Sequence, residues 1–123
     1  MPANTQPINL QQKFDLISEQ WTPKVIAEMN DYQFKLVKLQ GDFIWHDHPD
    51  TDETFLVIDG HLRIDLRDRS LHLGPGEMCV IPKGVEHKPF AADEAKVLLI
   101  EPRGVLNTGN LTTSRTAQND VWI

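Results

Sequence analysis

Two histidines separated by one residue, His46 and His48, are the side chains of this sequence best suited to chemistry. Because side chains alternate between the two faces of a strand, both imidazoles would point the same way, together with Ile44. If Ile44 faces the interior, both rings are buried, and each neutral ring then needs partners for two nitrogens. A metal ion is a partner that accepts both imidazoles at once. A pair of exposed histidines on an edge strand is the alternative, which this triplet alone leaves open.

A carboxylate and a third imidazole are candidates for the same site. Glu53 begins the run ETFLVI, whose alternation groups it with Phe55 and Val57. The loop of residues 49–52 lets this run return beside the first, so we expect Glu53 to face the histidines. His87 begins another short run after a turn. Three imidazoles and one carboxylate form a mixed nitrogen and oxygen donor set that suits Fe, Mn, Ni, Co, Cu or Zn.

The other polar candidates are interpreted as surface groups. His61 directly follows a turn, and His72 lies between two leucines, so alternation sends it to the opposite face from theirs. Asp47, Asp50 and Asp52 are expected to be loop or surface carboxylates that help to attract a cation.

Short strands must position these residues. Only Leu10, Phe14 and Ile17 show helical spacing, with Asn9 as the expected cap of a short N-terminal helix. Turn residues separate the remaining apolar runs, and the helical crossovers that a parallel sheet needs are missing from the pattern. The sequence therefore predicts an all-β fold, an antiparallel sandwich or barrel. The runs expected to form strands are KVIAEM, YQFKLVKLQ, DFIWHDH, ETFLVI, HLRIDL, SLHLG, EMCVIP, HKPFA and KVLLIE.

The dipeptide Asp59-Gly60 lies between two of these runs. Such a pair is typical of a two-residue type I′ turn, because that turn needs positive φ at both central positions. The sequence therefore predicts a β-hairpin in which residues 54–58 pair with residues 61–66.

The composition changes at Pro102, after which the chain is polar until it ends in Val121, Trp122 and Ile123. This tail is either frayed or docked through its three apolar residues. We favour the docked arrangement, because a terminal tryptophan between two aliphatic residues is costly to leave in water.

Residues 32–40 carry two lysines on opposite faces of the expected strand. Lys35 alternates with Val37, whereas Lys38 alternates with Leu36, so one of them could point inward. An inward lysine could hold a carboxylate or a phosphate. A lysine whose stem covers apolar surface while its amine stays in water is the favoured alternative.

Charge and composition exclude several functional classes. The net charge is −6 without a cluster of lysines or arginines, so nucleic acid is not expected as a partner. No window approaches the roughly 20 apolar residues of a membrane span, and the N-terminus lacks the pattern of a signal peptide, which predicts a cytoplasmic protein that does not bind membranes. The single cysteine, Cys79, is interpreted as a small buried hydrophobe.

The sequence around the candidate ligands resembles the two signature motifs of the cupin superfamily. The matching positions are Gly41, His46, His48, Glu53 and Gly60 in the first motif and Gly76, Pro82, Gly84 and His87 in the second. The spacings agree with the family pattern, except that four residues rather than five separate Gly41 from His46. Ala91 stands where many members have Asn. Neither departure removes a ligand.

The resemblance implies a jelly-roll β-barrel over residues 25–101, with an N-terminal helix and lead-in over 1–24 and a C-terminal arm over 102–123. It also implies one divalent transition metal per chain. The implied metal ligands are His46, His48, Glu53 and His87. The sequence is similar to small single-domain members described as mannose-6-phosphate-isomerase-like, and with its edge strands this favours a homodimer.

Four protein ligands on a six-coordinate ion would leave two positions for water, a substrate or O₂. Isomerase, lyase and dioxygenase chemistry all remain open, on a sugar or a small oxygenated acid or carbonyl compound. One alternative is a non-catalytic cupin that binds a small ligand or a metal. A sensory domain of a transcription regulator is disfavoured, because no helix-turn-helix pattern or basic segment follows residue 101.

Overall fold

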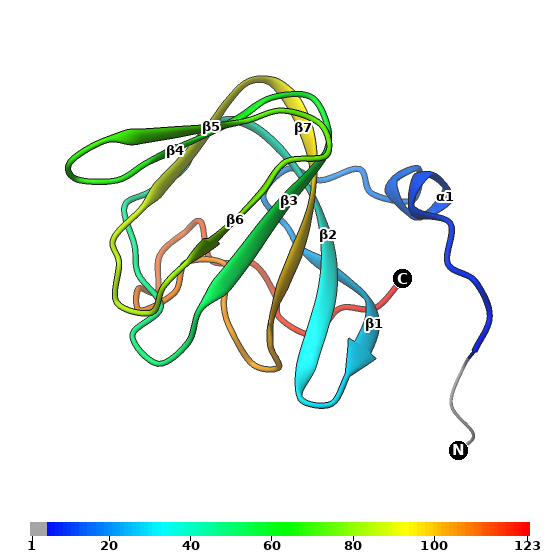
Figure 1. Cartoon of the computed structure of the whole chain (residues 1–123). Coiled ribbons are helices and arrows are strands. Elements are labelled where there is room, and N and C mark those ends of the chain that lie inside the picture. Colours follow the sequence, from blue (N-terminus) through cyan, green and yellow to red (C-terminus); the bar gives the residue numbers. More distant parts are fainter. Residues whose placement is uncertain (1–4) are drawn as a thin grey trace.

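A computed structural model describes residues 5–123, so the first four residues of the expected lead-in lie outside the described part. These described residues form one short helix and seven strands (Figure 1). These elements are α1 (Leu10–Phe14), β1 (Lys24–Met29), β2 (Tyr32–Asp42), β3 (Glu53–Asp59), β4 (Leu62–Asp65), β5 (Ser70–Leu73), β6 (Met78–Ile81) and β7 (Lys88–Pro102). All strand pairs are antiparallel, which confirms the predicted all-β fold of jelly-roll type.

The long strand β7 organises the sheet. The main strand order is β1-β2-β7-β3-β6, and β4 pairs with both β5 and β7. The runs HKPFA and KVLLIE, expected as two strands, are therefore parts of this one strand. Residues 92–94 between them are exposed, but their backbone stays extended. Because β7 pairs with β2, β3 and β4, it connects these strands in a single sheet.

The predicted hairpin at Asp59-Gly60 is wrong. Strand β3 pairs with β6 and β7, whereas β4 pairs with β5 and β7. Gly60 has a φ of +85°, and an added Cβ would lie 2.8 Å from the carbonyl oxygen of Glu94. The glycine is thus required because the chain passes close to β7, and the dipeptide joins strands that have different partners.

Two apolar clusters lie on opposite sides of the sheet. The interior cluster fills the barrel with side chains of β2, β3, β4 and β7, including Val37, Val57 and Val97. The outer cluster contains Phe14 and Ile17, which pack with residues of β1, β2 and β7. As predicted, Asn9 caps α1: its side chain accepts a hydrogen bond from the amide of Gln12 at 3.0 Å. The helix ends at Phe14, yet Ile17 remains buried beyond it.

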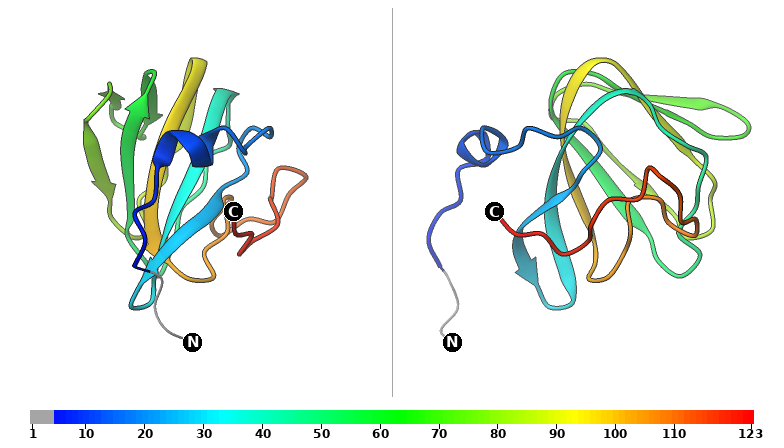
Figure 2. Two further views of the ribbon diagram at one scale, coloured as in Figure 1. Left: turned by 90° about the vertical axis from the view of Figure 1, so that its right-hand side faces the viewer. Right: turned by 180° about the vertical axis from the view of Figure 1, so that it is seen from behind.

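The C-terminal tail docks on its own chain, beside β1 (Figure 2). The amide of Val25 donates to the carbonyl of Val121 at 2.8 Å, and the amide of Ile123 donates to the carbonyl of Val25 at 3.1 Å. The side chain of Ile123 packs on the outer cluster, whereas that of Trp122 is 49% exposed. The tail docks as expected, but the backbone and Ile123 hold it in place, not the tryptophan.

None of the helices in the described part of the chain is long and apolar enough to cross a membrane. His61 and His72 are exposed, as predicted. Cys79 is half-buried against the interior cluster, and this burial raises the pKa of its thiol.

Candidate metal centre

The segment that carries the first two histidines is irregular, although a strand was expected there. Strand β2 ends at Asp42, and the backbone of His46 then forms an isolated bridge with His87, with N–O distances of 3.1 and 2.9 Å. Phe43 is buried whereas Ile44 is only half-buried, so the expected alternation from Ile44 does not hold. Both imidazoles are nevertheless buried, because the bridge to His87 directs the chain along the barrel wall.

The other two candidates come from regular elements. Glu53 is the first residue of β3, where the predicted alternation with Phe55 and Val57 is confirmed. His87 immediately precedes β7. The exposed fractions of the four side chains are 4% for His46, 5% for His48, 5% for Glu53 and 0% for His87.

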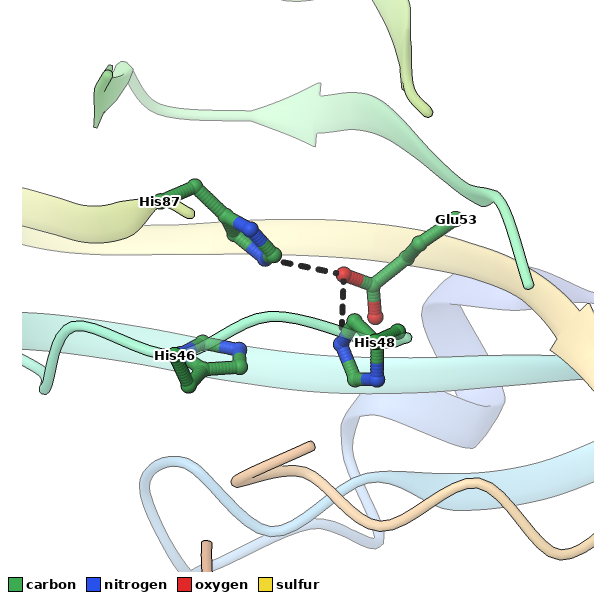
Figure 3. A group of neighbouring side chains, drawn as sticks. All are labelled: His46, His48, Glu53 and His87. Atoms are coloured by element: carbon green, nitrogen blue, oxygen red, sulfur yellow. Dashed lines mark ion pairs between the residues drawn. The ribbon is translucent and has the colours of Figure 1, made fainter. Parts of the chain in front are cut away.

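The four side chains converge inside the barrel, as Figure 3 shows. One nitrogen or oxygen atom of each lies within 4.8 Å of the corresponding atoms of the others, an arrangement that could hold a metal ion. The Oε1 atom of Glu53 lies 3.3 Å from Nε2 of His48 and 3.3 Å from Nε2 of His87. The sequence spacing therefore identified residues that the fold brings together. We refer to these four side chains as the donor cluster.

Backbone carbonyls fix the orientation of two rings in the donor cluster. Nδ1 of His46 lies 2.9 Å from the carbonyl oxygen of Ile44, and Nδ1 of His87 lies 2.9 Å from that of Val85. A carbonyl only accepts hydrogen bonds, so each Nδ1 must carry the proton. The lone pair of each Nε2 is then available to a metal, which is the usual tautomer of ligating histidines.

Three atoms of the donor cluster lack a conventional partner. Within the described residues, Nε2 of His48, Oε1 of Glu53 and Nε2 of His87 are buried and make no hydrogen bond. Buried polar atoms in native proteins are nearly always paired, because leaving one unpaired costs about 1–3 kcal/mol. The unpaired atoms all point to the same space, so the donor set fits a bound cation.

Burial and neighbouring groups prepare the cluster for a cation at neutral pH. Burial, followed by the proximity of His87, lowers the pKa of His46 to about 4, so this ring is neutral at pH 7. Burial alone would raise the pKa of Glu53, but the close approach of His48 and His87 lowers it well below the usual value. Neutral imidazoles and an ionised carboxylate are the forms that bind metals.

A buried ion pair lies next to the cluster and was missed by sequence reasoning. Nζ of Lys35 is 2.9 Å from Oε1 of Glu101 and donates to the carbonyl of Val105 at 3.1 Å. Burial and the negative charge of Glu53 raise the pKa of Glu101 well above its usual value. Lys35 thus points inward, against the favoured expectation, and holds a carboxylate of its own chain. The alternation of Glu101 with Leu99 on β7 was the available signal.

A mostly apolar cavity opens onto the donor cluster. Its empty volume, including the part open to solvent, is about 360 Å³. Eight of its eleven lining residues are apolar, and His46 and Glu53 form part of its wall. The lining residues are Trp21, Pro23, Val37, Leu39, Phe43, His46, Glu53, Phe55, Pro89, Leu99 and Asn107.

Part of the segment after residue 102 packs directly on the histidines. The amide of Asn110 donates to the carbonyl of Asp47 at 2.9 Å, and the side chain of Asn110 accepts from the amide of Asp47 at 3.2 Å. Gly109 has a φ of +61°, and an added Cβ would collide with the carbonyl oxygen of Asp47. This close approach holds the residue between His46 and His48 in place.

Comparison with known proteins agrees with this architecture. The family profile described as Cupin domain matches residues 35–101. The chain belongs to the cupin family. A crystal structure of a cupin-2 domain protein from Shewanella frigidimarina is 60% identical, with a TM-score of 0.77, and the match covers 78% of this cupin and 94% of that chain.

Two further proteins are similar to this cupin in sequence. A crystal structure of a protein from Neisseria meningitidis is 38% identical, with a TM-score of 0.73, over 79% of this cupin and 99% of that chain. The protein YdbB of Bacillus subtilis is 41% identical over 64 residues, which are 51% of this cupin and 57% of YdbB. The match thus spans little more than half the length of YdbB.

Proposed function

We propose that this cupin binds one divalent transition metal through His46, His48, Glu53 and His87, and acts as a metal-dependent enzyme on a small oxygenated substrate. The observation that carries the proposal is the set of three buried, unpaired donor atoms that point to one space. The adjoining cavity gives a small molecule access to the same space.

A bound divalent metal would supply a Lewis acid that polarises a carbonyl or lowers the pKa of a hydroxyl. The residues of the chain have distinct parts in this proposal. The carbonyls of Ile44 and Val85 hold two imidazoles in the ligating tautomer. Glu53 contributes the negative charge, and Phe55, whose ring lies 6.0 Å from that of His87, excludes water from one side. Substrates in this range are a sugar or a small oxygenated acid or carbonyl compound.

A non-catalytic cupin that binds a small ligand or a metal is the second candidate. One observation favours it: apart from donor-cluster residues, the only polar residue among those lining the cavity is Asn107. The side chain of Asn107 donates to the carbonyls of Trp21 and Arg115 and accepts from the amide of Ala117. It is therefore not free to act as a general acid or base.

Metal analysis of protein purified without a histidine tag tests the proposal. We expect close to one transition metal per chain, and loss of the metal in His46→Ala and His87→Ala. His72→Ala removes an exposed histidine outside the cluster and should retain the metal. Folded wild-type protein that contains no metal after growth in metal-replete medium would contradict the proposal. Turnover assays with sugar phosphates, 2-oxo acids and diketones then separate the enzyme from the binding protein.

We also propose a homodimer and a cytoplasmic location. Strand β6 lies at the end of the main strand order and exposes Met78 and Val80, which are 59% and 50% exposed. An apolar edge strand is a surface that proteins usually cover. A monomer by light scattering at micromolar concentration would contradict the dimer.

A further inference from the structure

The cavity beside the donor cluster has an aromatic wall. The rings of Trp21 and Phe43 are stacked, with centroids 4.6 Å apart and an angle of 11° between their planes. Phe43 also meets the ring of His46 edge to face, at a centroid distance of 5.5 Å. The wall thus leads from the cavity to one of the candidate ligands.

The backbone holds Trp21 in an unusual conformation at this place. Its φ is +60°, which is uncommon for a residue other than glycine. Its amide donates to the carbonyl of Lys38 at 2.8 Å, its indole donates to that of Gln40 at 2.9 Å, and its carbonyl accepts from Asn107 at 3.0 Å. Residues held in such conformations by several hydrogen bonds concentrate at functional sites.

The cavity offers few hydrogen bonds to the body of a ligand. The indole NH of Trp21 and the side chain of Asn107 are already bound to backbone groups. Polar atoms directed at a ligand therefore come from the donor cluster, at one end of the cavity. A sugar has a hydroxyl on nearly every carbon, and its burial here would leave several of them unpaired, at a cost for each.

We propose that the substrate has its metal-binding oxygen atoms at one end of a planar apolar body, as in an aromatic 2-oxo acid, and that Trp21 determines this specificity. The inference rests on the proposed metal site and narrows its substrate range by excluding sugars. The empty space of the cavity is about 360 Å³, part of it open to solvent, and this small space limits the body to about one ring.

Binding of three probes to the Co²⁺-loaded protein tests this inference. Phenylpyruvate and pyruvate carry the same 2-oxo acid group and differ in the aromatic ring, and glucose 6-phosphate represents the sugars. Titration calorimetry gives each affinity, and the visible spectrum of Co²⁺ reports direct coordination. We expect phenylpyruvate to bind about tenfold or more tightly than pyruvate, because burial of the ring adds apolar contact. Glucose 6-phosphate should bind more weakly than phenylpyruvate.

The outcomes separate this inference from the proposed function. Two outcomes, each with a change in the Co²⁺ spectrum, would overturn the inference but support the metal site. One is equal affinity for the two 2-oxo acids, and the other is tighter binding of glucose 6-phosphate than of phenylpyruvate. A bound metal whose spectrum none of the probes changes would overturn the inference and would favour the non-catalytic metal-binding cupin over the enzyme.

Substitutions of the aromatic wall test the role of Trp21. Trp21→Ala should retain pyruvate binding but reduce the preference for phenylpyruvate over pyruvate to about threefold or less. Trp21→Phe should restore most of this preference. Trp122→Ala, on the exposed tail, is the matched control. If Trp21→Ala does not fold, Phe43→Leu, which keeps an apolar side chain but removes the stacked ring, should also lower the ratio. A folded variant of the wall that keeps the wild-type ratio would overturn the assignment.

Discussion

Two buried polar groups lie next to each other in the barrel and differ in how their atoms are paired. The amine of Lys35 has two acceptors within 3.1 Å, one of them Oε1 of Glu101, and one buried atom of this pair, Oε2 of Glu101, makes no hydrogen bond. The donor cluster is buried to a similar degree, yet three of its atoms make no hydrogen bond. Exposure does not explain this difference. A buried polar group whose charged atoms pair with each other is structural, whereas a group with several unpaired atoms that meet in one space indicates a ligand.

Metal removal should give the largest change in the free energy of unfolding. It should act on the donor cluster and not on the Lys35–Glu101 pair. At a free metal concentration of about 1,000 times the dissociation constant, the metal would stabilise the fold by about 4 kcal/mol. Unfolding in urea with and without a chelator measures this difference. His87→Ala should remove the effect of the chelator, and His61→Ala should retain it. An unchanged unfolding curve of the metal-loaded wild-type protein after chelation would contradict the interpretation.

The Lys35–Glu101 pair should respond to the loss of one partner. Lys35→Met leaves Glu101 buried without its cation, and we expect a loss of about 3 kcal/mol in the free energy of unfolding. Adding Glu101→Leu should recover most of this loss, because no charged partner then remains. The exposed Lys83→Met is the control. A loss in Lys35→Met no larger than that in the control would show that the pair does not stabilise the fold.

Acid should lower the free energy of unfolding of the metal-free protein through protonation in the donor cluster. The pKa of His46 is lowered from 6.5 to about 4, so between these values the unfolded chain binds a proton that the folded chain does not. The free energy of unfolding therefore falls as the pH drops from 6.5 to 4, by roughly 2–3 kcal/mol from this residue. Urea titrations of the chelated protein at several pH values measure the slope.

The matched variants His46→Asn and His72→Asn isolate this contribution. The first should flatten the pH dependence between 4 and 6.5, and the second, at an exposed histidine, should not. Equal slopes in both variants would assign the acid sensitivity between pH 4 and 6.5 to other groups.

Local patterns predicted most of the strands, because burial alternates along runs such as ETFLVI. The run DFIWHDH is the exception, since it is irregular beyond Asp42. The pairing between strands was harder to predict from the sequence. Asp59-Gly60 has the chemistry of a tight turn, but packing against β7 determines its conformation. Residues 92–94 have the polarity of a loop, yet they continue β7 because their neighbours on both sides pair with β2, with a register shift between Leu39 and Gly41.

The sequence predicted the four residues of the donor cluster, but it did not predict the groups around them. The spacing of His46, His48 and Glu53 identified residues that meet. Ile44 is only half-buried, however, and a backbone bridge, not a regular strand, orients the two histidines. Glu101 was missed because its neighbour Glu53 is on another strand. Contacts of this kind depend on the closed barrel and not on any single segment.

The smallest predicted effect concerns the segment that supports the donor cluster. Gly109 and Gly104 both have positive φ, but only Gly109 faces a backbone atom, the carbonyl oxygen of Asp47, where a Cβ would be placed. Gly104→Ala should therefore cost only backbone strain, about 1 kcal/mol, whereas Gly109→Ala should cost about 2 kcal/mol and displace Asp47. Because Asp47 lies between His46 and His48, Gly109→Ala should also weaken metal binding, as measured by competition with a chelator. Equal metal affinity in the two variants would show that the donor cluster keeps its geometry without this contact.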